Sequence, residues 1–150
     1  MRRQLVLAAL AFALSLAIAM QLATSQVMGN VISADVDIHP NALQLKEGGC
    51  GNWITAHIDL PRDYDVNNID ISSVTLEVMG GHVSVSKHVV EGRGLMVKFD
   101  RAMVIGCLWS MVGHMSPRVK QEVSLTVVGN LYNGDAFEGS DTIEVFYTNL

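Results

Sequence analysis

The chain has 150 residues, which is enough for one domain with one hydrophobic core. Its formal charge is −5, with 15 Asp and Glu residues against 10 Lys and Arg. This acidic balance argues against nucleic acid as a partner, because binding to phosphates requires a basic face.

The N-terminus has the layout of a secretory signal peptide. Two arginines follow the first Met, and an uncharged apolar stretch then covers residues 5–16 before small residues that suit cleavage. We therefore expect a signal peptide over 1–25, a single domain over 26–150, and a secreted or cell-surface protein. An uncleaved membrane anchor is the alternative, because residues 5–23 contain only two polar side chains.

The chain contains two cysteines, Cys50 and Cys107. In an exported protein an even number of cysteines indicates disulfide bonding. A bridge that closes a loop of this length is worth about 4 kcal/mol in the chain-entropy account. Free thiols or a metal site are the alternatives, but no Cys-x-x-Cys pair points to a metal. We expect a Cys50–Cys107 disulfide.

After residue 30 the chain alternates apolar and polar residues in short runs, which is typical of half-buried strands. The first run, 36–45, contains Pro40. Because proline has no backbone donor, this strand is expected to lie at a sheet edge or to change sheets there. The next run, 53–60, points its aliphatic residues inward.

The middle of the chain predicts further strands at 74–79, 82–89 and 95–99, with turns at 80–81 and 91–94. In the strand at 82–89 the histidines and serines occupy one face and the valines the other.

Residues 102–115 are apolar without clean alternation, so a short crossing helix and a buried strand both fit. Strands at 123–127 and 143–147 follow, on either side of a strong hairpin turn at 133–135.

Seven or eight short strands, with turns about every ten residues, predict an all-β fold. The expected architecture is a two-sheet antiparallel β-sandwich of the immunoglobulin-like kind, with one short helical or irregular crossing near 101–115.

Several runs together resemble a known family. They are NALQLK (41–46), GNWITAHIDLP (51–61), VNNIDISSVTL (66–76), VKFDR (97–101), LTVVG (125–129) and FEGSDTIEV (137–145). The ordered set resembles uncharacterised β-sandwich modules of secreted and surface proteins in archaea and bacteria. There these modules often sit beside immunoglobulin-like repeats or dockerins.

The resemblance covers about residues 31–147. It implies a non-catalytic accessory or structural module outside the cell, with a protein partner or self-association at the surface. Bacterial relatives often carry a calcium-ligand run before the strand at 95–99. This chain has only Glu91-Gly92-Arg93-Gly94 there.

One loop carries oxygen side chains at a spacing that suits calcium. Asp63, Asp65 and Asn67 match the first three ligand positions of an EF-hand-type loop, and Asp70 follows, but Val74 stands at the distal acidic position. The alternative is an exposed turn whose side chains accept hydrogen bonds from nearby backbone amides. No other cofactor is expected.

No residue pattern points to an enzyme. The sequence lacks a nucleophile motif such as Gly-x-Ser-x-Gly. Cys107 and His114 are close in sequence, but an exported cysteine with a partner available is expected to be bridged. His82 and His88 would lie about 20 Å apart along one strand, too far for one zinc ion.

Two other roles remain open. Residues 26–35 could extend into the groove of a neighbouring copy and build an extracellular filament or surface layer. Trp53 and Trp109 could stack on sugar rings in a carbohydrate-binding module. The alternative for both rings is packing in the core against the disulfide.

Overall fold

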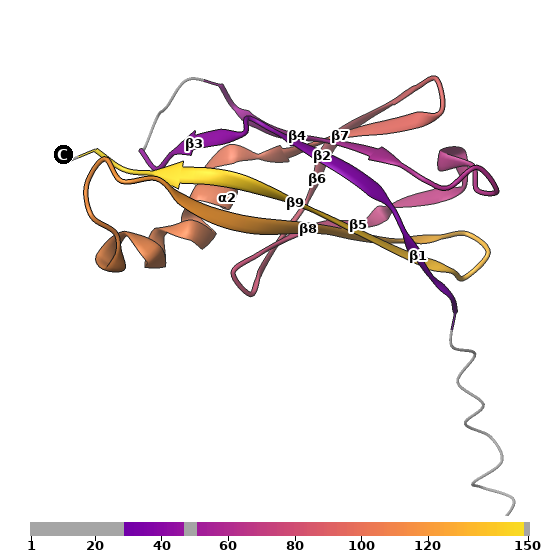
Figure 1. Ribbon diagram of the computed structural model, residues 1–150. Coiled ribbons are helices and arrows are strands. Elements are labelled where there is room, and N and C mark those ends of the chain that lie inside the picture. The colour runs from indigo at the N-terminus through magenta and orange to yellow at the C-terminus, as the bar shows by residue number, and fades with distance from the viewer. Residues whose placement is uncertain (1–28, 47–50, 149–150) are drawn as a thin grey trace, which may run out of the picture.

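The computed structural model describes residues 29–46 and 51–148, and these are mainly β-structure (Figure 1). The predicted signal peptide at 1–25 and Cys50 lie outside these ranges. The elements are β1 Val31–Ser33, β2 Asp35–His39, β3 Ala42–Gln44, β4 Trp53–Asp59, η1 Val66–Asn68, β5 Ile69–Val78, β6 Gly81–Glu91, β7 Gly94–Asp100, α2 Arg101–Leu108, η2 Trp109–His114, β8 Gln121–Leu131 and β9 Ala136–Phe146.

The strands form one mixed sheet that curls around the core. Their order is β1-β9-β8-β5-β6-β7-β4-β2, and β3 also pairs with β9. The pairs of β9 with β1 and with β3 are parallel, whereas the other neighbours are antiparallel. Figure 1 shows two layers, with β9, β8 and β5 in one and β2, β4 and β7 in the other.

The prediction of a mainly β fold with a short helix near 101–115 is confirmed. The structure differs from the expected antiparallel sandwich in three respects. The sheet is mixed, the described ranges contain nine strands rather than seven or eight, and β6 joins the two layers into one sheet.

β6 can join both layers because it is 11 residues long and changes partner midway. Its first part, Gly81–Ser84, pairs with β5, and its second part, 85–91, pairs with β7. The register shifts between Val85 and Lys87. Such an irregularity bends a strand and increases its twist, which directs the second half of β6 toward the other layer.

Because of this shift, the side chains after Val85 face the opposite way from the prediction. Beyond it, His88 and Val90 pair with the core-facing residues Val97 and Leu95. The two histidines predicted to share one face, His82 and His88, therefore do not do so. A shift of one residue moves every following side chain to the opposite face.

The N-terminal strands close the sheet. β1 pairs with β9, β2 crosses to β4, and β3 returns to β9. The chain changes layers after β2, at Pro40, which follows a cis peptide bond. The prediction for Pro40 is a sheet edge or a change of sheets, and both are found, since β2 ends the strand order and the chain changes layers after it.

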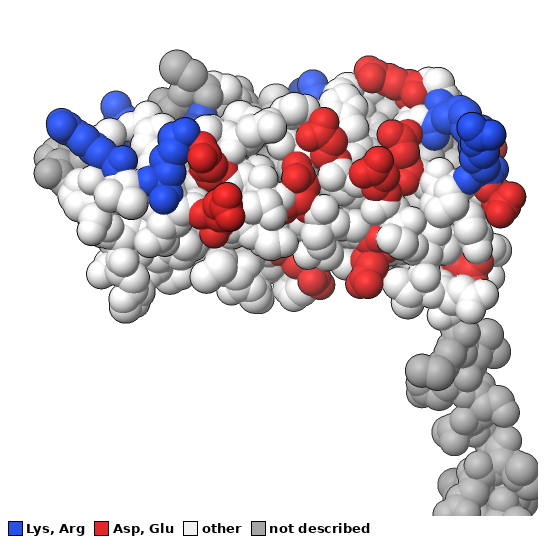
Figure 2. Space-filling model, viewed as in Figure 1, with Lys and Arg blue, Asp and Glu red and all other residues white. Residues whose placement is uncertain are grey.

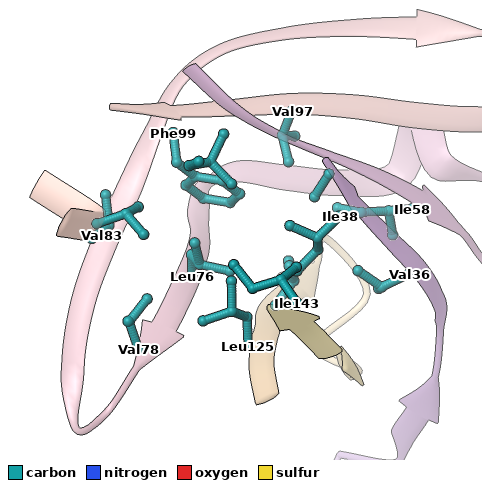
Figure 3. Packing of buried hydrophobic residues seen from close by; sticks show 14 of the residues in the cluster. Val36, Ile38, Ile58, Leu76, Val78, Val83, Val97, Phe99, Leu125 and Ile143 are labelled. Carbon is teal, nitrogen blue, oxygen red and sulfur yellow. The ribbon is translucent and has the colours of Figure 1, made fainter. Parts of the chain in front are cut away.

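The two layers enclose a single hydrophobic core. Figure 3 shows Ile58 of β4 and Val97 and Phe99 of β7 facing Leu76, Leu125 and Ile143 of the other layer. These side chains alternate with exposed or half-buried neighbours along each strand. The described core contains no buried polar or charged residue, so apolar burial supplies its stability.

The helix α2 and the turn η2 cover one end of the core. Asp100 caps α2, since its Oδ1 accepts hydrogen bonds from the amides of Ala102 at 2.8 Å and Met103 at 3.2 Å. Leu108 of α2 is fully buried. Of the two interpretations of residues 102–115, the helix is therefore correct, and Asp100 is its cap.

Candidate interaction surface

The second half of β6 differs from the other strands in its exposure. In β4 and β7 buried residues alternate with half-buried or exposed ones, whereas all six residues from Ser86 to Glu91 are exposed. Val89 and Val90 point to opposite faces and are 42% and 40% exposed. Neither face of this half-strand is therefore covered by the rest of the described chain.

Sequence reasoning missed this surface, although the sequence contains a signal for it. The adjacent valines 89 and 90 break the alternation of the preceding residues, which a half-buried strand would have continued. Two adjacent β-branched residues in a strand indicate either burial on both faces or exposure on both. The structure shows the second case.

The outer surface of β2, β4, β7 and β6 presents its side chains in register. One row across the four strands contains His39, Thr55, Lys98 and Lys87, and the next contains Asp37, His57, Met96 and Val89. Lys87 and Lys98 are direct neighbours, and like charges in this position disfavour the pairing. The described residues contain no carboxylate in a salt bridge with either lysine.

A shallow hollow of about 170 Å³ lies on this surface. It is lined by Lys87, His88, Val89, Met96 and Lys98. The Lys87 ammonium group lies 4.8 Å from the centre of the Trp53 ring, a distance at which a cation and an aromatic face attract each other. The hollow thus combines two positive charges with apolar side chains.

The tryptophans do not lie in the core. Trp109 is 42% exposed at the start of η2, and Trp53 is half-buried on the outer face of β4. The alternative in which both rings pack in the core is therefore wrong. Trp53 alternates with the buried Ile54, and this places its ring outside. Because Lys87 sits over the Trp53 ring, that ring face is occupied.

Negative charge dominates the face formed by β2 and β9. Figure 2 shows acidic side chains along the middle of this view and basic ones toward its two ends. The exposed acidic residues include Asp35 and Asp37 of β2 and Glu138 of β9. Only one carboxylate of β9, that of Glu144, has a described lysine partner, Lys120.

One acidic residue of this face has a structural role. Asp141 Oδ2 accepts a hydrogen bond of 2.8 Å from the backbone amide of Ile38, whose side chain is fully buried. β2 pairs with β4 at this point and not with β9. The Asp141 carboxylate therefore links β2 to β9 across the seam between the two layers.

The histidines of β2 and β4 meet on the outer surface. His39 lies 3.0 Å from Asp37 Oδ2 through Nε2 and 2.7 Å from Asn41 Oδ1 through Nδ1. The rings of His39 and His57 stand edge to face with centres 6.1 Å apart. These contacts order the chain around Pro40. The described residues contain no group of three or more His, Cys, Asp or Glu side chains that could hold a metal ion.

Two of the predicted calcium ligands, Asp65 and Asp70, accept hydrogen bonds from their own loop. Asp65 caps η1, and its Oδ1 accepts from the backbone and side-chain nitrogens of Asn67 at 2.9 and 2.8 Å. Asp70 Oδ1 accepts from the amide and hydroxyl of Ser72, and Asp63 is exposed. This geometry is that of the alternative, an exposed turn; calcium binding stays a prediction.

The hydrogen bonds to Asp65 also change its acidity. The backbone amide of Asn67, followed by its side-chain amide, stabilises the carboxylate and lowers the pKa of Asp65 below its ordinary value. The positive charge of Arg93 acts in the same direction.

Of the two cysteines only Cys107 is described, half-buried on α2 and without a disulfide bond. Its Sγ lies close to the β5–β6 turn, where a Cβ added at Gly81 would come within 2.7 Å of it. Arg101, at the start of α2, donates its backbone amide to the Asn52 carbonyl. Cys50 itself lies outside the described residues. The predicted Cys50–Cys107 disulfide stays a prediction.

Residues predicted for strand exchange lie in the sheet of their own chain. Residues 31–33 pair with β9 as β1, and Asp35 pairs with Asp59 of β4. Residues 26–28 lie outside the described ranges. Exchange of this segment between copies would therefore require the same pairs to form with a neighbouring chain.

Comparison of the chain with protein-family models, with curated proteins and with solved structures finds no match. Within residues 29–46 and 51–148, none of the helices has both the length and the apolar character needed to cross a bilayer.

Proposed function

We propose that this protein is a non-catalytic structural or interaction module outside the cytoplasm, and that it contacts a protein partner through β6 and β7. The observation that carries this proposal is the exposure of all residues from Ser86 to Glu91 in an otherwise well-packed sheet. An uncovered strand that presents valines on both faces is a surface at which other chains bind.

The finer fold that we propose is an immunoglobulin-like sandwich whose layers share one strand. In an immunoglobulin domain, strands A, B, E and D form one sheet and C, F and G the other. Here β2, β4, β7 and the second half of β6 take the first order, and β5, β8 and β9 take the second. The ordered sequence runs that resemble surface β-sandwich modules support the same assignment.

Export is the second part of the proposal and rests on the N-terminal sequence. Mass spectrometry of the protein recovered from its cells tests it. We expect a chain that begins near residue 26, outside the cytoplasm, with Cys50 linked to Cys107. A cytoplasmic chain with residues 1–25 intact and both thiols free would refute this part.

Cross-linking in living cells tests the contact surface. A photo-activated residue in place of Val89 is expected to give a covalent adduct with a protein, whereas the same residue in place of the exposed Ser124 on β8 is expected to give none. Equal adducts from the two positions, or no adduct from position 89, would contradict the proposed surface.

A further inference from the structure

The second half of β6 has a free edge. β6 pairs with β5 only through Gly81–Ser84, whereas its pairing with β7 extends to Glu91. On the side that faces β5, residues 85–91 therefore have no strand partner within the described ranges. This leaves a run of backbone donors and acceptors that a further strand can pair with.

The turn between β6 and β7 determines which backbone groups point to that edge. Gly92 has a φ of 63° at the first central position of a two-residue turn, as in a type II′ hairpin. Glu91 and Gly94 then form a hydrogen-bonded pair. Hydrogen-bonded and non-hydrogen-bonded pairs alternate in an antiparallel ladder. The backbone groups of Lys87 and Val89 therefore bond to β7. Those of His88 and Val90 point to the free edge.

The sequence of this edge is complementary to itself. In Lys87-His88-Val89-Val90-Glu91, the positive and negative residues stand at equal distances from Val89. If a second copy is laid antiparallel with Val89 opposite Val89, each Lys87 lies opposite Glu91 of the second copy. A two-fold symmetric interface requires this reciprocity.

We propose that two copies of this chain associate edge to edge through β6 in this register. His88 of each copy then faces Val90 of the other in a hydrogen-bonded pair, which gives four backbone hydrogen bonds across the interface. The two Val89 side chains meet on the axis in a non-hydrogen-bonded pair, where side chains approach most closely. β7-β6 of each copy continue into one sheet.

The charges of the described residues favour a second copy of this chain over a strand of another protein. Lys87 lies beside Lys98 and has no carboxylate partner among the described residues, and the same holds for Glu91 and cations. The pairing neutralises both charges, and for this the Lys87 ammonium group turns from the Trp53 ring toward the free edge. Short edges bury less area than a standard interface, so we expect a dimer that dissociates with a Kd of about 10 to 100 μM.

This inference rests on the proposed role as an interaction module and names the partner. The two proposals can fail separately. A chain that stays monomeric but gives an adduct with a different protein from position 89 would refute the dimer and support the interaction module.

Sedimentation equilibrium of the full chain, as purified after export, tests the dimer. Between about 1 μM and 1 mM, which brackets the expected Kd, the average mass is expected to rise from one chain toward two. Lys87→Glu and Glu91→Lys each place like charges opposite each other and are expected to weaken association at least tenfold. The double variant restores opposite charges and is expected to recover most of it. Glu122→Lys, an equal charge change on the exposed face of β8, is the control and is expected to leave association unchanged.

A second variant tests the backbone bonds. Val90→Pro removes an N–H that points to the free edge and not to β7, so it is expected to abolish the dimer while the thermal midpoint of the monomer changes little. A mass of one chain at about 1 mM, well above the expected Kd, would overturn the proposal. So would a single charge reversal that leaves the Kd unchanged, a dimer that survives Val90→Pro, or a double variant that does not recover association.

Discussion

At the scale of single residues, a few polar side chains stabilise the fold through hydrogen bonds that the sequence pattern does not reveal. Asp141 and Asp65 look like ordinary surface carboxylates in the sequence. In the structure Asp141 accepts a hydrogen bond from the Ile38 amide and so links the two layers. Asp65 caps the 3-10 turn η1. The partner of Asp141 is 103 residues away, so local sequence reasoning could not identify it.

Removing the Asp141 carboxylate is expected to destabilise the protein. Asp141→Ala leaves the Ile38 amide without its acceptor at the edge of the core, which costs about 1–3 kcal/mol. Urea unfolding measures the loss. Glu138→Ala, which removes an exposed carboxylate of the same face and strand, is expected to cost less than about 0.5 kcal/mol. Equal effects of the two variants would contradict the role of Asp141.

Asp65 is expected to contribute to the acid sensitivity of the fold. Its folded pKa lies below the unfolded value of about 3.9, so its contribution is fully present above that value and is lost as the pH falls through the lowered pKa. Unfolding midpoints measured between pH 6 and pH 2 should therefore fall less steeply toward low pH for Asp65→Asn than for the wild type. Parallel curves for the two proteins would show that the lowered pKa does not contribute.

At the scale of elements, much of the fold could be predicted because the apolar alternation is strong. Alternation identifies β4, β7 and β8, and the change of layer at Pro40 follows from the missing proline donor. The sharing of β6 between layers could not be predicted, because it depends on a register shift at one residue. The free edge of β6 was missed for the same reason.

The helix α2 provides a test at this scale. Asp100→Ala removes the acceptor of two N-terminal amides and is expected to cost about 0.5–2 kcal/mol of folding stability. Asp100→Asn is the matched variant, since asparagine caps a helix about as well as aspartate, and it should retain most of the stability. If the Asn and Ala variants lose the same folding stability, capping does not explain the presence of Asp100.

At the scale of the whole molecule, burial and charge separate two kinds of surface. Acidic side chains are spread over the face of β2 and β9 (Figure 2), whereas the outer face of β6 and β7 combines two lysines with Val89 and Met96. The core has no buried polar or charged residue within the described ranges. The contact between chains that we propose uses the second of these surfaces.

Amide hydrogen exchange along β6 reports whether its second half has a free edge. At the lowest concentration that can be measured, the amides of Lys87 and Val89 are expected to be protected by β7, whereas those of His88 and Val90 exchange freely at the open edge. As concentration rises, the second pair should become protected as well. If all four amides exchange alike at every concentration, β6 has no free edge and the account is wrong.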